Sequence, residues 1–135
     1  MAGYSATPLV KKLGIKSGFN VALINAPAGF SSELDLPSDV TINSRSSKPV
    51  DLALLFVKRE KDLKQRFAQY VVKLKPEGML WVAWPKKSSE VASDLSFTNV
   101  QSIGLAAGLV DTKICAVNEV WSGLKFVFRL KDRPF

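Results

Sequence analysis

The segment LKPEGMLWVAWPKK, residues 74–87, decides the fold of this chain. A helical pattern comes before it and cannot continue through it, because Pro76 and Gly78 stop a helix. The apolar run at 79–84 then predicts a buried strand, which ends at a proline followed by two lysines. A helix end, a turn and a buried strand in this order are typical of nucleotide-binding α/β domains.

Strand and helix patterns alternate on both sides of this segment. Short apolar runs predict further strands at 20–24, 40–42, 50–57, 111–117 and 124–130, and apolar stripes predict helices at 59–74 and 97–107. This alternation predicts an α/β fold, a three-layer Rossmann-like and mostly parallel sheet of about six strands. The loop at 118–123 joins the last two strands into an antiparallel C-terminal hairpin.

The connections suggest an order for the strands across the sheet. That expected order is 40–42, 20–24, 50–57, 79–84, 124–130 and 111–117. The link from 40–42 to 50–57 has about seven residues and reaches about 23 Å when extended. Such a link is short for a crossover past strand 20–24. Whether 40–42 belongs to the sheet therefore stays open.

Length and composition indicate one domain. The chain has 135 residues, 47% of them hydrophobic, and we expect a single reduced α/β domain over residues 1–135. It has one cysteine, no signal peptide and no apolar run of about 18 residues, which predicts a cytoplasmic protein without membrane contact. The absence of histidine removes the commonest general base and metal ligand, so we expect no metal site. The net charge of +7 permits attraction to a polyanion.

Several motifs identify the chain with a known family. They are GYS at 3–5, TPL at 7–9, KKLGIK at 11–16, WVAWPKK at 81–87, GLVD at 108–111 and CAVNEVWSGL at 115–124. In these motifs the chain resembles, over nearly its full length, a family of short bacterial proteins known only as a domain of unknown function. That resemblance implies no activity.

The second half is also similar to Rossmann-like S-adenosylmethionine-dependent methyltransferases. The likeness is carried by VDLALL at 50–55, LKPEGMLWV at 74–82 and the terminal reversed hairpin. Enzymes of this class have a glycine-rich loop after the first strand and an acidic residue at the end of the second. Here NAPAG at 25–29 has one late glycine, Pro27 removes an amide donor, and NSR at 43–45 carries no acid. These departures count against a bound cofactor, S-adenosylmethionine included.

In open α/β sheets, ligands bind at the carboxyl ends of the strands where the strand order reverses. That crevice is expected between strands 20–24 and 50–57. The candidate ligand-binding residues on its rim are Asn25, Pro27, Gly29, Lys58, Arg59, Lys86, Lys87, Glu119 and Trp121. Four cations and a helix N-terminus on one edge could bind an anion or phosphate. The alternative is the ordinary solvated rim of a basic α/β domain.

The remaining candidates point mostly to structural roles. Trp81 and Trp84 are three residues apart and are expected in the core on opposite faces of their strand, whereas Trp121 lies in a predicted loop and could stack on a base. Cys115 is expected to be a buried, inert thiol, and Asp51 to be structural. No nucleophile has a histidine to activate it, so no catalytic residue is assigned.

Three hypotheses for function follow. The first is a Rossmann-like cytoplasmic module without catalytic activity that binds a protein partner or an anionic small molecule. The second is a divergent S-adenosylmethionine-dependent methyltransferase with Gly29 in its cofactor loop. The third is nonspecific nucleic-acid binding through the basic edge, which predicts an affinity that falls steeply with salt.

Overall fold

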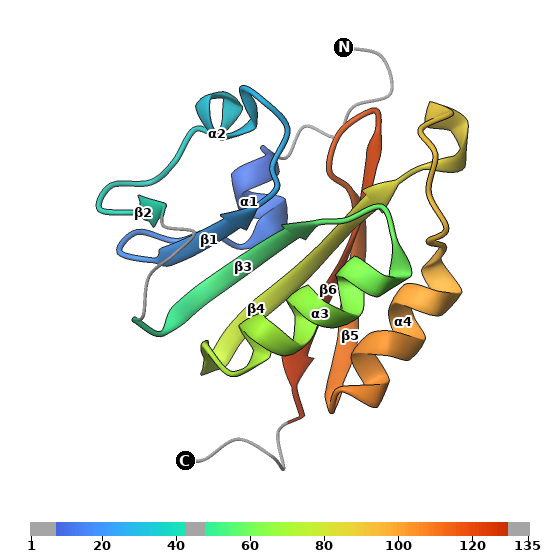
Figure 1. Ribbon diagram of the computed structural model, residues 1–135. Helices are drawn as coiled ribbons and strands as arrows, with labels where there is room; N and C mark the ends of the chain where they lie inside the picture. Colours follow the sequence, from blue (N-terminus) through green and yellow to red (C-terminus); the bar gives the residue numbers. More distant parts are fainter. Residues whose placement is uncertain (1–7, 43–47, 130–135) are drawn as a thin grey trace.

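The protein is described by a computed structural model over residues 8–42 and 48–129. Its elements, in chain order, are α1 (Leu9–Leu13), β1 (Asn20–Ile24), α2 (Phe30–Glu33), β2 (Thr41–Ile42), β3 (Val50–Phe56), α3 (Glu60–Val71), β4 (Leu74–Pro85), the 3-10 turn η1 (Lys87–Ser89), α4 (Phe97–Ala106), β5 (Leu109–Ala116) and β6 (Trp121–Phe128). The described strands form one six-stranded sheet in the order β2-β1-β3-β4-β6-β5 (Figure 1). This is the predicted order.

The pairing of the strands confirms the mixed α/β sheet. Strands β2, β1, β3 and β4 pair in parallel, and β6 is antiparallel to both β4 and β5. The open question about residues 40–42 is settled, since β2 pairs with β1 through Thr41 and Ile42. The segment 43–45, compared above with the acidic position of methyltransferases, lies outside the described residues.

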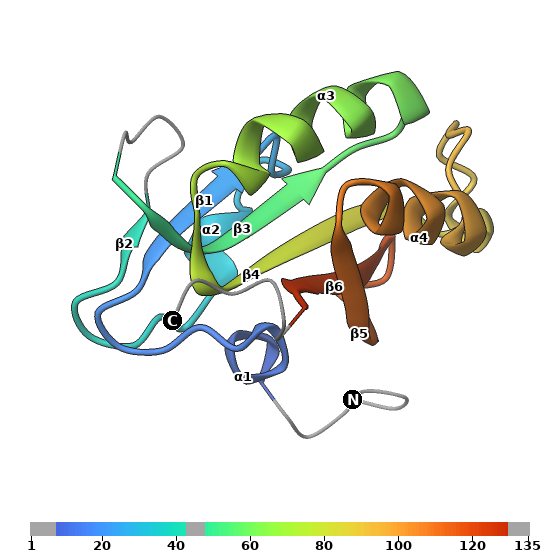
Figure 2. The ribbon, with the colours of Figure 1, turned by 90° about the horizontal axis from the view of Figure 1, so that it is seen from below.

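Two helical layers cover the sheet, α3 and α4 on one face and α1 and α2 on the other (Figure 2). The core on the α3 side includes Leu55, Leu63, Phe67, Trp84, Val100 and Phe126. The core on the α1 side includes Val10, Leu13, Phe30, Leu54, Phe56, Trp81 and Trp121. Trp81 and Trp84 therefore lie on opposite faces of β4, as predicted. The Trp81 Nε1 donates to the Leu13 carbonyl at 2.9 Å and so fixes α1 to the sheet.

The first half of the segment that decides the fold differs from its prediction. Helix α3 ends at Val71, and β4 already begins at Leu74, where a turn was expected. The register passes from Val50–Leu74 to Leu52–Met79, so the proline and glycine residues are accommodated as a bulge inside the strand. Asp51 holds this end of the sheet, because its carboxylate accepts from the Asn20 amide at 2.7 Å and pairs with Lys75 at 2.9 Å.

Helix α4 begins at a capping box that the sequence analysis did not identify. The Ser96 hydroxyl accepts from the Asn99 amide, and the Asn99 side chain accepts from the Ser96 amide. Phe97 and Ala107, the apolar residues at the two ends of the predicted helix, are exposed. Gly104 packs against the sheet in their place. A glycine is not a hydrophobic residue, so the apolar stripe did not reveal this contact.

Candidate functional site

The candidate site is a pocket of about 360 Å³ at the carboxyl ends of β1 and β3. The chain leaves β1 toward β2 on one side, and β3 lies on the other, so the strand order reverses at this point. The lining residues are Asn25, Pro27, Phe56, Val57, Lys58, Asp62 and Trp121. The fold thus brings together four of the predicted rim residues, which come from three separate segments of the chain.

One wall of the pocket is the turn that follows β1. Asn25 and Gly29 both have positive φ, 58° and 82°, so the chain reverses sharply between them. The Phe30 amide donates to the Pro27 carbonyl at 3.0 Å, which closes the turn. The turn leads into α2, which has only four residues. A long helix with free amides at its start, as a phosphate site would need, does not follow β1.

The floor of the pocket is aromatic. Phe56 contacts Phe30 edge to face at 4.9 Å and Trp121 edge to face at 5.0 Å. All three rings are buried. The prediction that Trp121 lies in the loop of the hairpin is wrong. It is the first residue of β6 and pairs with Pro85, because a large apolar ring gains more by packing over Phe56 than by facing water.

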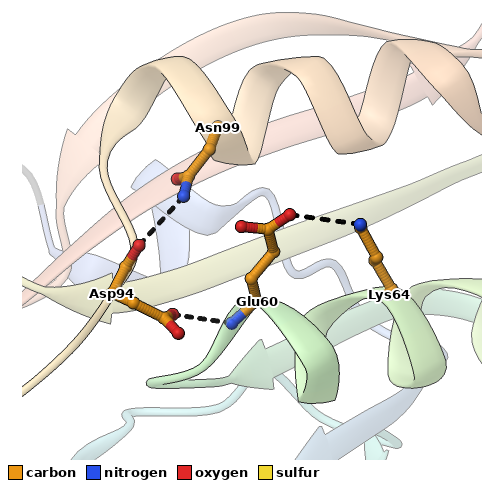
Figure 3. A network of polar contacts seen from close by, with 4 residues as sticks. All are labelled: Glu60, Lys64, Asp94 and Asn99. Carbon is orange, nitrogen blue, oxygen red and sulfur yellow. Dashed lines mark hydrogen bonds and ion pairs between the residues drawn. The ribbon is translucent and has the colours of Figure 1, made fainter.

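The opposite wall begins with Lys58, which follows β3, and Asp62, which lies in the first turn of α3; both are exposed. The Lys58 carbonyl accepts from the Ser93 hydroxyl at 2.8 Å and from the Asp94 amide at 3.1 Å. The Asp94 carboxylate in turn accepts from the Glu60 amide at 2.7 Å (Figure 3). The loop after β4 therefore holds the start of α3 in place.

Figure 3 also shows how this contact is supported on each side. Asn99 of α4 donates from its Nδ2 to the Asp94 carbonyl at 2.9 Å, and Glu60 pairs with Lys64 at 3.1 Å within α3. The Glu60–Lys64 pair has the spacing of one helical turn, which the sequence alone indicates. No such local spacing indicates the role of Asp94, which joins the two helices.

These contacts change the expected electrostatics of the site. The helix N-terminus near Arg59 was expected to attract an external anion. Its Glu60 amide is bonded to Asp94 instead, and Glu60 and Asp62 add two carboxylates in the first turn. Since the protein's own acids already complement the helix dipole, a multiply charged phosphate gains little at this end of α3.

The other predicted rim residues do not line the pocket. Gly29, Arg59 and Lys87 are exposed outside the lining, and Glu119 is exposed in the hairpin turn. Lys86 is half-buried, and its amide donates to the Val120 carbonyl at 2.7 Å. Of the four rim cations, Lys58 alone is a lining residue among those that the structure describes.

Sequence reasoning missed Asp62 as a pocket residue. The spacing of Asp62 and Arg66, one helical turn apart, suggests an ion pair between them, but the Arg66 guanidinium donates to Gln69 at 3.4 Å. A carboxylate in the first helical turn after a strand-end lysine was the available signal. It predicts a lysine and an acid on the same rim.

The pocket does not fit an S-adenosyl cofactor in the usual way of this fold. The loop after β1 has a single glycine, and a Cβ added at Gly29 would meet no atom within 4 Å, so no close approach requires a glycine there. Pro27 lines the pocket and has no amide hydrogen to donate. We therefore derive no methyl-transfer step.

Over residues 8–42 and 48–129, no group of three or more His, Cys, Asp or Glu side chains could hold a metal ion. Within the same ranges, no helix has both the length and the apolar character needed to cross a bilayer.

Comparisons with known proteins identify a family and a fold. The family model described as "Protein of unknown function (DUF3052)" matches residues 35–130. A search of curated proteins finds no match.

Solved structures of similar fold include methyltransferases and a complex with S-adenosyl-L-methionine. Magnesium protoporphyrin IX methyltransferase from Synechocystis aligns with a TM-score of 0.60 and 8% identity, over 90% of this chain and 74% of that one. A SAM-dependent methyltransferase from Aquifex aeolicus aligns with a TM-score of 0.56 and 15% identity, over 87% and 86%. Fibrillarin from Aeropyrum pernix, in complex with S-adenosyl-L-methionine, aligns with a TM-score of 0.60 and 11% identity, over 93% and 70%. At these identities the likeness concerns the fold alone.

Proposed function

We propose that this chain, which belongs to the DUF3052 family, is a cytoplasmic Rossmann-like module that binds a small anionic molecule in the crevice between β1 and β3 without catalysing a reaction. The observation that carries this proposal is the pocket at the switch point, with an aromatic floor and Lys58 on its rim. Pockets at such points are where α/β sheets hold their ligands.

The lining suggests what kind of molecule fits. Phe56, Val57 and Trp121 offer apolar surface to a flat body, and the Asn25 amide can both donate and accept hydrogen bonds. Lys58 can pair with one carboxylate or one phosphate group. Asp62 repels a second negative charge on the same wall. A ligand with a flat apolar body and a single anionic group suits this balance better than a nucleoside triphosphate.

The chemistry of the lining supports binding without catalysis. Nucleophilic catalysis needs a nucleophile within hydrogen-bond reach of an activating base, and general acid–base catalysis needs a group beside the reacting atoms whose pKa suits proton transfer. The chain has no histidine, and the pocket brings one carboxylate and one ammonium group to its opening. Ligand binding requires only that these residues complement the ligand in shape and charge.

The test is isothermal titration of the full chain against aromatic carboxylates, nucleoside mono- and triphosphates and S-adenosyl compounds. We expect an aromatic monoanion to bind, and Lys58→Ala to weaken that binding by about tenfold or more, since a charge-assisted hydrogen bond is lost. Lys61→Ala removes an exposed lysine of α3 outside the pocket and is the matched control. No heat with any compound, or equal loss in both variants, would refute the proposal.

The divergent methyltransferase is the second candidate, favoured by the position of the pocket within this fold. It predicts that S-adenosylhomocysteine binds and that replacing Gly29 by a bulky residue abolishes the binding. Saturable binding with that loss would displace our proposal. Nucleic-acid binding through the rim is less well supported, because its cations do not converge on the pocket.

A further inference from the structure

The face of the β5–β6 hairpin that lies on the α1 side carries positive charge that the crevice does not use. Lys113 of β5 and Lys125 of β6 are register partners, directly opposite each other. Both lie on the α1 side, because a Cβ at Gly123, two residues before Lys125, would meet Trp81 of the core on that side. We call Lys12, Lys113 and Lys125 the lysine face.

Helix α1 brings the third lysine to this face. The Lys113 Nζ donates to the Lys12 carbonyl at 3.2 Å, so the end of α1 contacts the edge of the hairpin. The ammonium groups of Lys113 and Lys12 both act to lower the pKa of the Cys115 thiol, although burial raises it more strongly. Lys12 and Lys113 therefore both lie near Cys115, and Lys125 lies directly opposite Lys113.

No ion pair between described residues neutralises this charge. Among the residues that the structure describes, the ion pairs lie elsewhere, on α3 and at the amino end of β3, and none includes a member of the lysine face. Like charges directly opposite on neighbouring strands destabilise a sheet. Burial lowers the pKa of Lys125, and the charge of Lys113 lowers it further.

Protection of the sheet edge does not account for the whole cluster. β5 is an edge strand, and Lys113 on it can discourage pairing with another chain. Lys125 lies on β6, between β4 and β5, where there is no edge to protect. A half-buried lysine opposite another lysine on an inner strand lowers the stability of the fold. A binding function would explain why both lysines are present.

The surroundings of the lysine face indicate the kind of partner. The next register pair on the same face is Val110 with Val127, both half-exposed, so an apolar pair lies beside the cationic pair. We propose that the lysine face binds an extended acidic segment of a partner protein, with carboxylates on Lys113 and Lys125 and an apolar side chain on the valine pair. Charge complementarity carries this assignment.

A nucleic acid fits this surface less well. Base stacking needs exposed aromatic rings, and Trp81, the register partner of Lys125 on β4, is buried. The lysine face is separate from the crevice, so the failure of one proposal does not bear on the other.

The test uses a short fluorescein-labelled peptide of alternating glutamate and valine, titrated with the full chain at low and at high salt. We expect binding that weakens with salt and that Lys125→Glu reduces by about tenfold or more, because an attraction becomes a repulsion. This variant should fold, since the introduced carboxylate would face Lys113 as an opposite charge. Lys61→Glu makes the same change of net charge on exposed α3 and is the control.

Every other outcome overturns the assignment. Absence of peptide binding at low salt would exclude an acidic partner, and unchanged binding by Lys125→Glu would place it on another surface. A labelled single-stranded DNA of equal charge is titrated in parallel. If the DNA binds as tightly as the peptide, with the same loss in Lys125→Glu, the surface selects anions in general and not an acidic segment.

Discussion

The packing of α4 against β6 makes a sharp prediction at Gly104. A Cβ added there would lie 2.0 Å from Cε1, 2.4 Å from Cζ and 2.6 Å from Cδ1 of the Phe126 ring. These distances are far shorter than any van der Waals contact. The Phe126 side chain is fully buried and packs edge to face on Phe67 at 5.2 Å, so its ring has no free direction in which to move.

Two opposing effects set the size of the change in Gly104→Ala. Alanine favours a helix over glycine by about 0.8–1.0 kcal/mol. Overpacking a buried contact costs about 1–3 kcal/mol, and the ring-face overlap at this site argues for the upper end. The net effect is a loss of about 2 kcal/mol in the free energy of unfolding. For a chain of this length that corresponds to a drop of about 6–8 °C in Tm.

Urea denaturation followed by tryptophan fluorescence measures this difference. Ser102→Gly, at an exposed position of α4, isolates helix propensity and should cost about 0.5 kcal/mol. In a Phe126→Leu background, Gly104→Ala should lose most of its cost, which gives a coupling energy of about 1–3 kcal/mol. Stabilisation by Gly104→Ala alone, or strict additivity in the double variant, would refute the close approach of α4 to β6.

Three further predictions concern the loop before α4 and the hairpin. Asp94→Ala removes the acceptor of the Glu60 amide and should lower the free energy of unfolding, measured by urea denaturation, by about 1 kcal/mol. Asp94→Asn keeps an oxygen acceptor and should lower it less. Equal losses in the two variants would contradict a capping role. Lys125→Gln removes a like-charge pair with Lys113 and should raise the free energy of unfolding by about 0.2–1 kcal/mol, and a clear decrease would argue against the observed register. The Cys115 thiol, whose pKa is raised by burial, should react with iodoacetamide more slowly in the folded than in the unfolded chain at one pH. Lys113→Gln should slow that reaction further, because the lysine lowers the same pKa, and faster modification would contradict its position beside the thiol.

The sequence predicted the position of the candidate site but not which charged residues line it. The alternation of strands and helices indicated where the strand order reverses, and the pocket lies there. The sequence pattern also suggested four converging cations, of which one lines the pocket. Asp94 explains part of this difference. It lies 34 residues after the Glu60 amide that it binds, and no local pattern reports a contact of that range.

Cys115 illustrates a smaller difference of the same kind. Its apolar neighbours predicted a buried thiol, but the structure places it on the outermost strand, half-buried. Residues of an edge strand are covered on fewer sides than those of a central strand. The burial of a residue on β5 depends on how far the helical layer extends over that strand. The adjacent helix α1 has only five residues and leaves Cys115 half-buried.

The sequence by itself determined the order of the elements, the order of the strands and the opposite placement of Trp81 and Trp84. These features follow from local periodicity and from the rules that connect consecutive strands. The tertiary structure alone decided that β6 begins at Trp121 and not at Leu124, which buries this ring and places Lys125 opposite Lys113. The physical reason is that the register of two strands depends on packing across the whole sheet, and a shift of one residue exchanges the faces of all their side chains.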